Sequence, residues 1–127
     1  MANCICELQP TALWKNFYNL CQVPHPSHHL EQITKLIVDF GKGLGLETIV
    51  DKAGNVLIRK PATPGMEDRM GIILQAHVDM VPQKNNDVEH DFKKDPIKPR
   101  IVDDMVFHLF FIAIIVFSSC LISLCIF

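Results

Sequence analysis

The predicted fold depends on residues 71–79, which read GIILQAHVD. Residues 72–76 are nearly all apolar, as in a strand that is buried on both faces of a sheet. The polar residues His77 and Asp79 follow directly. Because side chains at positions i and i+2 of an extended chain project to the same side, their imidazole and carboxylate are expected to emerge together. The stretch therefore predicts an apolar strand that presents a polar pair at its carboxyl end.

The segment before this strand has the pattern of a β-hairpin. Residues 46–50 and 55–59 are rich in β-branched and apolar side chains, and the four residues between them end in Gly54. A polar loop, residues 61–69, then leads to the apolar strand.

Two helices are predicted before the hairpin. The first follows Pro10 and has apolar residues at helical spacing, namely Leu13, Phe17, Leu20 and Cys21. The second runs from about Ser27, whose hydroxyl is expected to cap it, to Phe40. Two helices, a hairpin and a buried strand in this order predict an α/β domain with its chemistry at the end of the last strand.

The composition divides the chain into two parts. All 12 basic and 14 acidic residues, all 8 prolines and all 6 glycines lie in residues 1–104, and residues 105–127 contain none of them. The basic residues are scattered and the formal net charge is −2, so nucleic acid is not an expected partner. The N-terminus lacks the basic and apolar regions of a secretory signal, which predicts a cytoplasmic protein.

The tail, residues 105–127, is apolar at 19 of its 23 positions. As a helix it would extend about 34 Å, enough to cross a bilayer as a C-terminal anchor. Its phenylalanine, isoleucine, leucine and serine residues have largely thymine-rich codons, so we expect a mistranslated end produced by a frameshift or an unspliced segment. A membrane anchor and a soluble buried helix are the alternatives.

Other polar clusters have ordinary structural explanations. Capping or solvent exposure is expected for His25, His28 and His29, with metal binding as the alternative. The cysteines, which are odd in number, are expected to be free thiols in a reducing compartment. A solvated loop is expected for the acidic residues Asp87, Glu89, Asp91 and Asp95. Taken alone, the sequence His77-Val78-Asp79 is better explained as a structural or surface pair, because His-x-Asp often occurs by chance.

Several stretches together resemble the N-terminal part of the M20-type metallopeptidases, in the branch of the aminoacyl-histidine dipeptidases. The stretches are VPHPS at 23–27, residues 51–67, LQAHVDMVPQKN at 74–85, and residues 90–97. The likeness fades near residues 101–106. It covers most of this chain but only the beginning of a family member, so residues 1–104 are interpreted as part of a zinc-peptidase-like catalytic domain.

The resemblance implies a hydrolase of dipeptides, Xaa-His and broader, that uses two zinc ions, with cobalt or manganese as substitutes. It implies that His77 is a metal ligand and that Asp79 is the catalytic carboxylate that orients the site. It also implies a homodimer in the full-length form. The family's other ligands and its general-base glutamate lie beyond the point where the likeness fades, so a complete site is not expected in this chain.

Three hypotheses follow for function. The first is a fragment of a metal-dependent dipeptidase that is inactive alone, since a catalytic zinc ion needs three protein ligands and an open position. The second is a non-catalytic membrane protein, anchored by residues 105–127, that reuses the first elements of the peptidase. The third is weak binding of one metal ion through His77, Asp79 and water.

Overall fold

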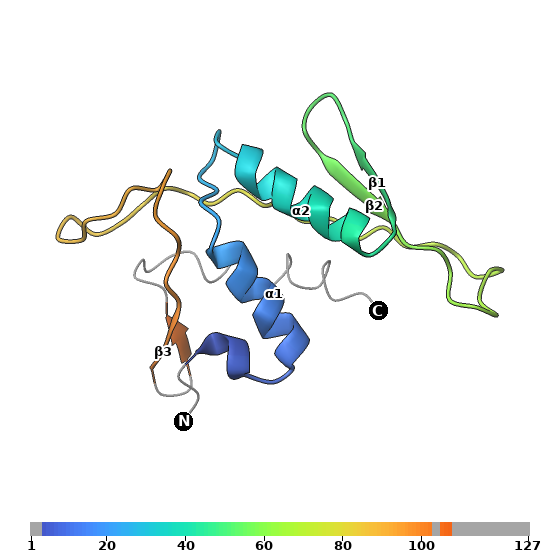
Figure 1. Cartoon of the computed structure of the whole chain (residues 1–127), viewed down its shortest axis with the longest axis horizontal. Helices are drawn as coiled ribbons and strands as arrows, with labels where there is room; N and C mark the ends of the chain where they lie inside the picture. The colour runs from blue at the N-terminus through green and yellow to red at the C-terminus, as the bar shows by residue number, and fades with distance from the viewer. Residues whose placement is uncertain (1–3, 103–104, 108–127) are drawn as a thin grey trace. The chain divides into compact units, whose positions relative to one another are not determined.

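The computed structural model describes residues 4–102 and 105–107, which divide into two compact units (Figure 1). The site unit consists of the described parts of Met1–Leu30 and Leu74–Phe127, and the hairpin unit is Glu31–Ile73. Both units contain helix and strand, which confirms the predicted α/β class in its coarse form.

The site unit begins with the 3₁₀ helix η1, Ile5–Glu7, followed by the helix α1, Thr11–Cys21. The first predicted helix is therefore confirmed. Pro10 precedes it in an extended conformation. Proline lacks an N–H group, and this costs no hydrogen bond here, because an N–H group at the start of a helix has no partner within the helix. η1 packs against α1, and the side chain of Ile5 is buried.

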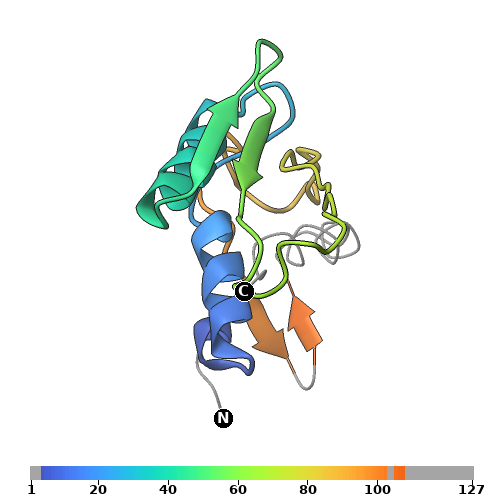
Figure 2. The same cartoon turned by 90° about the vertical axis from the view of Figure 1, so that its right-hand side faces the viewer.

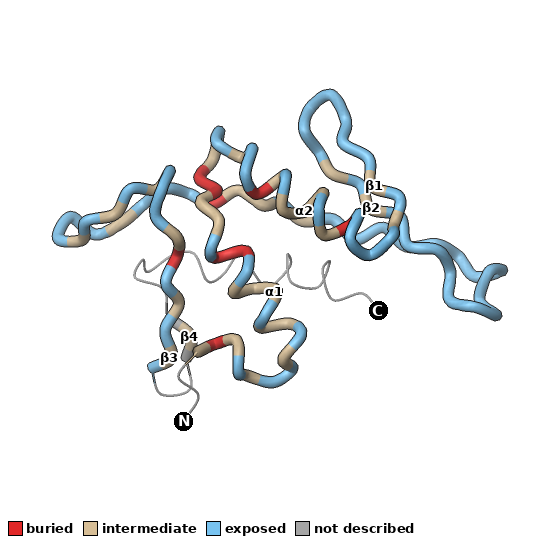
Figure 3. Tube along the Cα trace, in the orientation of Figure 1, coloured by how far each residue is buried: buried red, intermediate tan, exposed pale blue. Residues whose placement is uncertain are grey.

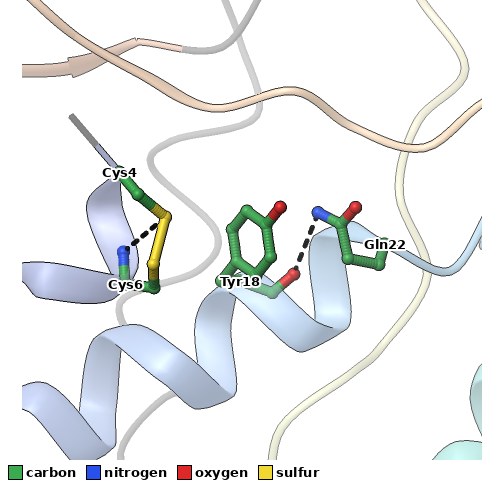
Figure 4. The surroundings of a disulfide bond; sticks show 4 residues. All are labelled: Cys4, Cys6, Tyr18 and Gln22. Atoms are coloured by element: carbon green, nitrogen blue, oxygen red, sulfur yellow. Dashed lines mark hydrogen bonds between the residues drawn. A yellow bond between two sulfur atoms is a disulfide. The ribbon is translucent and has the colours of Figure 1, made fainter.

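Cys4 and Cys6 form a disulfide around the start of η1, with Cα atoms 5.2 Å apart (Figure 4). The prediction of free thiols is wrong for this pair, because one intervening residue leaves the two side chains within bonding reach. The Cys6 N–H also donates to Cys4 Sγ at 3.2 Å. Cys21 is a free, buried cysteine, as predicted, and Cys120 and Cys125 lie outside the described residues.

The core of the site unit is a small apolar cluster of Cys21, Met80 and Ile97, with Phe17 and Phe92 packed against it. The Ile97 N–H donates to the Cys21 carbonyl at 2.8 Å. This bond satisfies one of the carbonyls that a helix leaves unpaired at its C-terminal end. The end of α1 is thereby joined to a segment far along the sequence.

Strands β3, Arg100–Val102, and β4, Met105–Phe107, pair antiparallel in the site unit (Figure 2). The prediction of an apolar helix from residue 105 is wrong for Met105–Phe107, whose backbone bonds to a neighbouring strand instead of to its own next turn. The rest of the predicted tail helix, residues 108–127, lies outside the described residues. In the described part of the chain, no helix combines the length and apolar character needed to cross a membrane.

The hairpin unit begins with α2, Glu31–Gly43. The second helix is confirmed, but it starts four residues after the predicted cap Ser27 and extends beyond Phe40. Residue His28 has a φ of 70°, which is outside the helical region, and this separates Ser27 from the helix. Ile33 and Gly41 are the buried residues of α2.

The predicted hairpin is confirmed as β1, Glu47–Val50, paired antiparallel with β2, Val56–Arg59 (Figure 2). Its turn is fixed by Asp51, whose carboxylate accepts bonds from the N–H groups of Ala53 and Asn55 at 2.8 and 2.9 Å. Gly54 has a φ of 90°, a conformation that glycine adopts without steric cost.

The predicted buried strand at residues 72–76 is not observed. These residues form no strand, and Ile72 and Ile73 are 79% and 90% exposed (Figure 3). A strand is defined by hydrogen bonds to a neighbour, and no strand of the described residues pairs with this segment. The segment is apolar, but no strand among the described residues pairs with it and buries it.

Candidate metal-binding site

His77 and Asp79 lie together, as their spacing predicts. His77 Nδ1 and Asp79 Oδ1 are 2.8 Å apart, and the two side chains are 54% and 38% exposed. An ionised carboxylate only accepts hydrogen bonds, so His77 donates through Nδ1 and its neutral form leaves the Nε2 lone pair available. Metal-binding histidines commonly have this arrangement, with a carboxylate on one ring nitrogen and a metal on the other.

The second oxygen of the Asp79 carboxylate is bound by Ser27. The Ser27 hydroxyl donates to Asp79 Oδ2 at 2.7 Å, so the two carboxylate oxygens have different partners. The bond from Ser27, and then the bond and charge of His77, hold the pKa of Asp79 below its ordinary value although partial burial opposes them. Asp79 is therefore ionised at neutral pH and able to orient an imidazole.

A short backbone pairing brings Ser27 to Asp79. Pro26 and Met80 form an isolated parallel bridge, in which Met80 N–H donates to the His25 carbonyl and Ser27 N–H donates to the Met80 carbonyl, each at 3.0 Å. Pro26 itself contributes no N–H group and needs none, because the residues on either side of it make the bonds. Pro26 and Met80 are both buried, so the joint is protected from water.

His25 lies beside this joint and is buried, with 1% of its surface exposed. The prediction of capping or solvent exposure is wrong for this histidine, whose Nδ1–H donates to the Val23 carbonyl at 2.5 Å. Burial lowers the pKa of His25, and the Val23 bond and the Asp79 charge oppose this effect. His25 is thus a neutral structural residue of the site unit.

The other candidate residues do not join the site. His28 and His29 are exposed, as predicted, and so are Asp87, Glu89, Asp91 and Asp95. Within residues 4–102 and 105–107, no three His, Cys, Asp or Glu side chains are grouped so that they could hold a metal ion. The described residues therefore supply one oriented imidazole and its carboxylate.

Ser27 is the site residue that sequence reasoning missed. The sequence predicts a helix cap for it, because serine often occupies that position. Its actual contact is to residues more than fifty positions away, and only the bridge between Pro26 and Met80 creates it. Local spacing contains no signal for such a contact.

No protein-family model matches this chain, but the chain is similar to known dipeptidases. The cytosol non-specific dipeptidase of Escherichia coli (strain K12) is 54% identical over 100 residues, which are 79% of this chain and 21% of that protein. The crystal structure of aminoacylhistidine dipeptidase from Vibrio alginolyticus matches with a TM-score of 0.79 and 49% identity, over 82% of this chain and 21% of that one. The chain thus spans about one fifth of the length of these relatives.

Proposed function

We propose, because this chain is a homologue of one part of the aminoacyl-histidine dipeptidases, that it supplies part of the catalytic domain of a metal-dependent dipeptidase. In this proposal His77 is a metal ligand and Asp79 is the carboxylate that holds it. The observation that carries the proposal is the 2.8 Å contact between His77 Nδ1 and Asp79 Oδ1. It occurs within residues 74–85, a stretch whose sequence resembles the N-terminal part of that family.

The residues present fit a zinc ion as part of a larger ligand set. Zinc binds imidazole nitrogen, and His77 offers Nε2 from a partly exposed ring whose orientation is fixed by Asp79. A pair of such ions supplies Lewis-acid polarisation of the scissile carbonyl and an acidified water. The contribution of Asp79 is to keep the His77 proton on Nδ1, which leaves Nε2 able to bind metal.

The remaining ligands are proposed to come from outside the described residues. A catalytic zinc ion takes three protein ligands, and the described residues group fewer than that around His77. Because the family resemblance places the other ligands and the general-base glutamate beyond the matched part of the relatives, we expect the 127-residue chain alone to be inactive toward dipeptides. The proposed substrates of the complete enzyme are dipeptides, Xaa-His and broader, and its proposed location is the cytosol.

A chimera tests the proposal. The matched 100 residues of this chain replace their counterpart in the E. coli dipeptidase, and hydrolysis of an Xaa-His dipeptide is measured with zinc present. The chimera is expected to be active, and His77→Ala is expected to lower its kcat/KM by more than about a hundredfold. Asp79→Ala is expected to cost roughly ten- to a hundredfold.

His29→Ala serves as the matched control, because His29 is an exposed histidine in the same unit that does not join the site. Its kcat/KM is expected to stay within twofold, about 0.4 kcal/mol, of the unsubstituted chimera. If His77→Ala and His29→Ala have equal rates, His77 is not a metal ligand. Dipeptide turnover by the purified 127-residue chain with zinc or cobalt would disprove the expected inactivity.

A further inference from the structure

We infer that Ser27 is a positioning residue whose hydroxyl fixes the Asp79 carboxylate and thereby holds His77 in its Nδ1–H form. The hydrogen-bonded series Ser27–Asp79–His77 carries this inference. Its significance for metal binding rests on the proposed function, whereas the effect of Ser27 on the His77 ring does not.

The two oxygens of the Asp79 carboxylate accept hydrogen bonds from different donors. Oδ2 accepts from Ser27 Oγ at 2.7 Å and Oδ1 accepts from His77 Nδ1 at 2.8 Å. A carboxylate can rotate about its bond to Cβ, and with one partner its oxygens can exchange. Two different donors fix the rotation, so Oδ1 stays in line with the His77 ring. Hydrogen bonds to an ionised acceptor are also about twice as strong as neutral ones.

The position of the Ser27 hydroxyl is set by the backbone. Ser27 N–H bonds to the carbonyl of Met80, the residue that follows Asp79, at 3.0 Å. Met80 N–H bonds in turn to His25, and Met80, Pro26 and His25 are all buried. The donor and the carboxylate are thus held on two segments joined by a buried bridge, and Ser27 Oγ has little freedom to leave Asp79.

Two competing roles for Ser27 are weaker. A helix cap is excluded by the start of α2 at Glu31. The Ser27 hydroxyl also lies 3.4 Å from the Met80 carbonyl, but a hydroxyl has one proton and the shorter bond goes to the charged oxygen of Asp79. The principal role of the hydroxyl is therefore at Asp79.

The test measures which ring nitrogen of His77 carries the proton. The full 127-residue chain, with ¹⁵N-labelled histidine and no metal, is studied by long-range ¹H–¹⁵N NMR at a pH where the imidazole is neutral. The unsubstituted protein is expected to show His77 mainly as Nδ1–H. Ser27→Ala is expected to raise the ratio of Nε2–H to Nδ1–H by roughly fivefold, the effect of losing one hydrogen bond. Ser27→Thr, which keeps the hydroxyl, is expected to leave the ratio unchanged.

A merely structural role of Ser27 would not move this ratio in a folded variant. The amide signals of Ile97 and Met80 check the fold, and Ser27→Cys provides a second variant of similar size that lacks a strong O–H donor. Asp79→Ala shows how far the ratio of Nε2–H to Nδ1–H changes when the carboxylate is absent. If Ser27→Ala and Ser27→Cys leave the ratio unchanged while Asp79→Ala shifts it, Ser27 is not a positioning residue.

The two proposals fail in different ways. A shifted ratio in Ser27→Ala together with an inactive chimera would overturn the proposed function and leave the role of Ser27 standing. An active chimera whose kcat/KM is the same with and without Ser27→Ala, together with an unshifted ratio, would overturn the role of Ser27 alone.

Discussion

The thiol of Cys21 lies in the apolar cluster of the site unit and has no measurable exposure. Burial raises its pKa from the ordinary value of 9.0 to about 12, because a thiolate would lose its hydration there, and a backbone hydrogen bond opposes the effect only in part. The reactive form of a cysteine is the thiolate, so the reactivity of Cys21 reports on the integrity of this cluster.

Cys21 is expected to resist alkylation. At pH 8 the raised pKa leaves about a thousandfold less thiolate than in the unfolded chain, since each pKa unit is a factor of ten. Iodoacetamide labelling followed by peptide mapping would measure this rate, and the urea-unfolded protein is the control. A Cys21 peptide that is alkylated equally fast in both states would contradict the buried cluster.

The titration of Cys21 is also expected to lower the free energy of unfolding at alkaline pH. The unfolded state loses the Cys21 proton above about pH 9, but the folded state keeps it to about pH 12. The unfolded state is therefore favoured as pH rises between these values, and the free energy of unfolding should fall by roughly 1.4 kcal/mol for each pH unit. Urea unfolding at pH 10, 10.5 and 11, between the two pKa values, measures the slope.

Cys21→Ala removes the titrating group and is the control for this slope. Its free energy of unfolding should fall less steeply above pH 9 than that of the unsubstituted protein, because unfolding no longer releases the Cys21 proton. Equal slopes for the two proteins would show that the Cys21 proton is not linked to folding.

At the scale of elements, α2 approaches the hairpin through Gly41, a buried glycine. A Cβ at this position would overlap Thr48 Oγ1 and lie 2.9 Å from Ile58 Cδ1. Thr48 is β-branched and hydrogen-bonded to the Leu46 carbonyl, so it has little room to move. Gly41 is thus required by close packing within the hairpin unit.

Gly41→Ala is expected to destabilise the hairpin unit by about 1–3 kcal/mol, because overpacking outweighs the higher helix propensity of alanine. Gly43→Ala is the matched control in the same helix, where a Cβ would meet nothing within 4 Å. That variant should be neutral or stabilising by up to about 1 kcal/mol. Urea unfolding followed by circular dichroism would compare them, and equal stabilities would refute the close approach.

The elements that sequence predicts correctly are those built from local contacts. The helix after Pro10 follows from apolar spacing, and the hairpin follows from two β-rich runs around Gly54. The pair His77 and Asp79 is equally local, since its geometry depends on two residues of spacing. Ser27 could not be predicted in the same way, because its partner is brought to it by a bridge between distant segments. The strand predicted at 72–76 also depends on a distant contact, because a strand forms only when a neighbouring strand pairs with it.

At the scale of the whole molecule, the exposed segment around Ile72 and Ile73 is an apolar stretch with unpaired backbone groups among the described residues. Such a stretch can pair with another chain, as exposed edge strands do. Met70, next to it, is 91% exposed and extends the apolar surface. Self-association of the chain at this segment is the expected result.

Replacing Ile72 and Ile73 with lysine is expected to reduce self-association, because the charges would repel a second copy and cost no buried contact. Light scattering after size-exclusion chromatography would measure the fall in average mass. Met66→Lys, at another exposed apolar side chain of the same unit, is the control and should have little effect. An average mass that is unchanged by Ile72→Lys with Ile73→Lys would place the association elsewhere.

The bond from the Ile97 amide to the Cys21 carbonyl has a practical consequence. Both residues are buried, and the bond joins the end of α1 to a segment that lies far along the chain. Deuterium can reach this amide only when the two segments separate. Its exchange rate therefore reports how often the site unit opens, and it can be followed at one amide signal without a bound ligand.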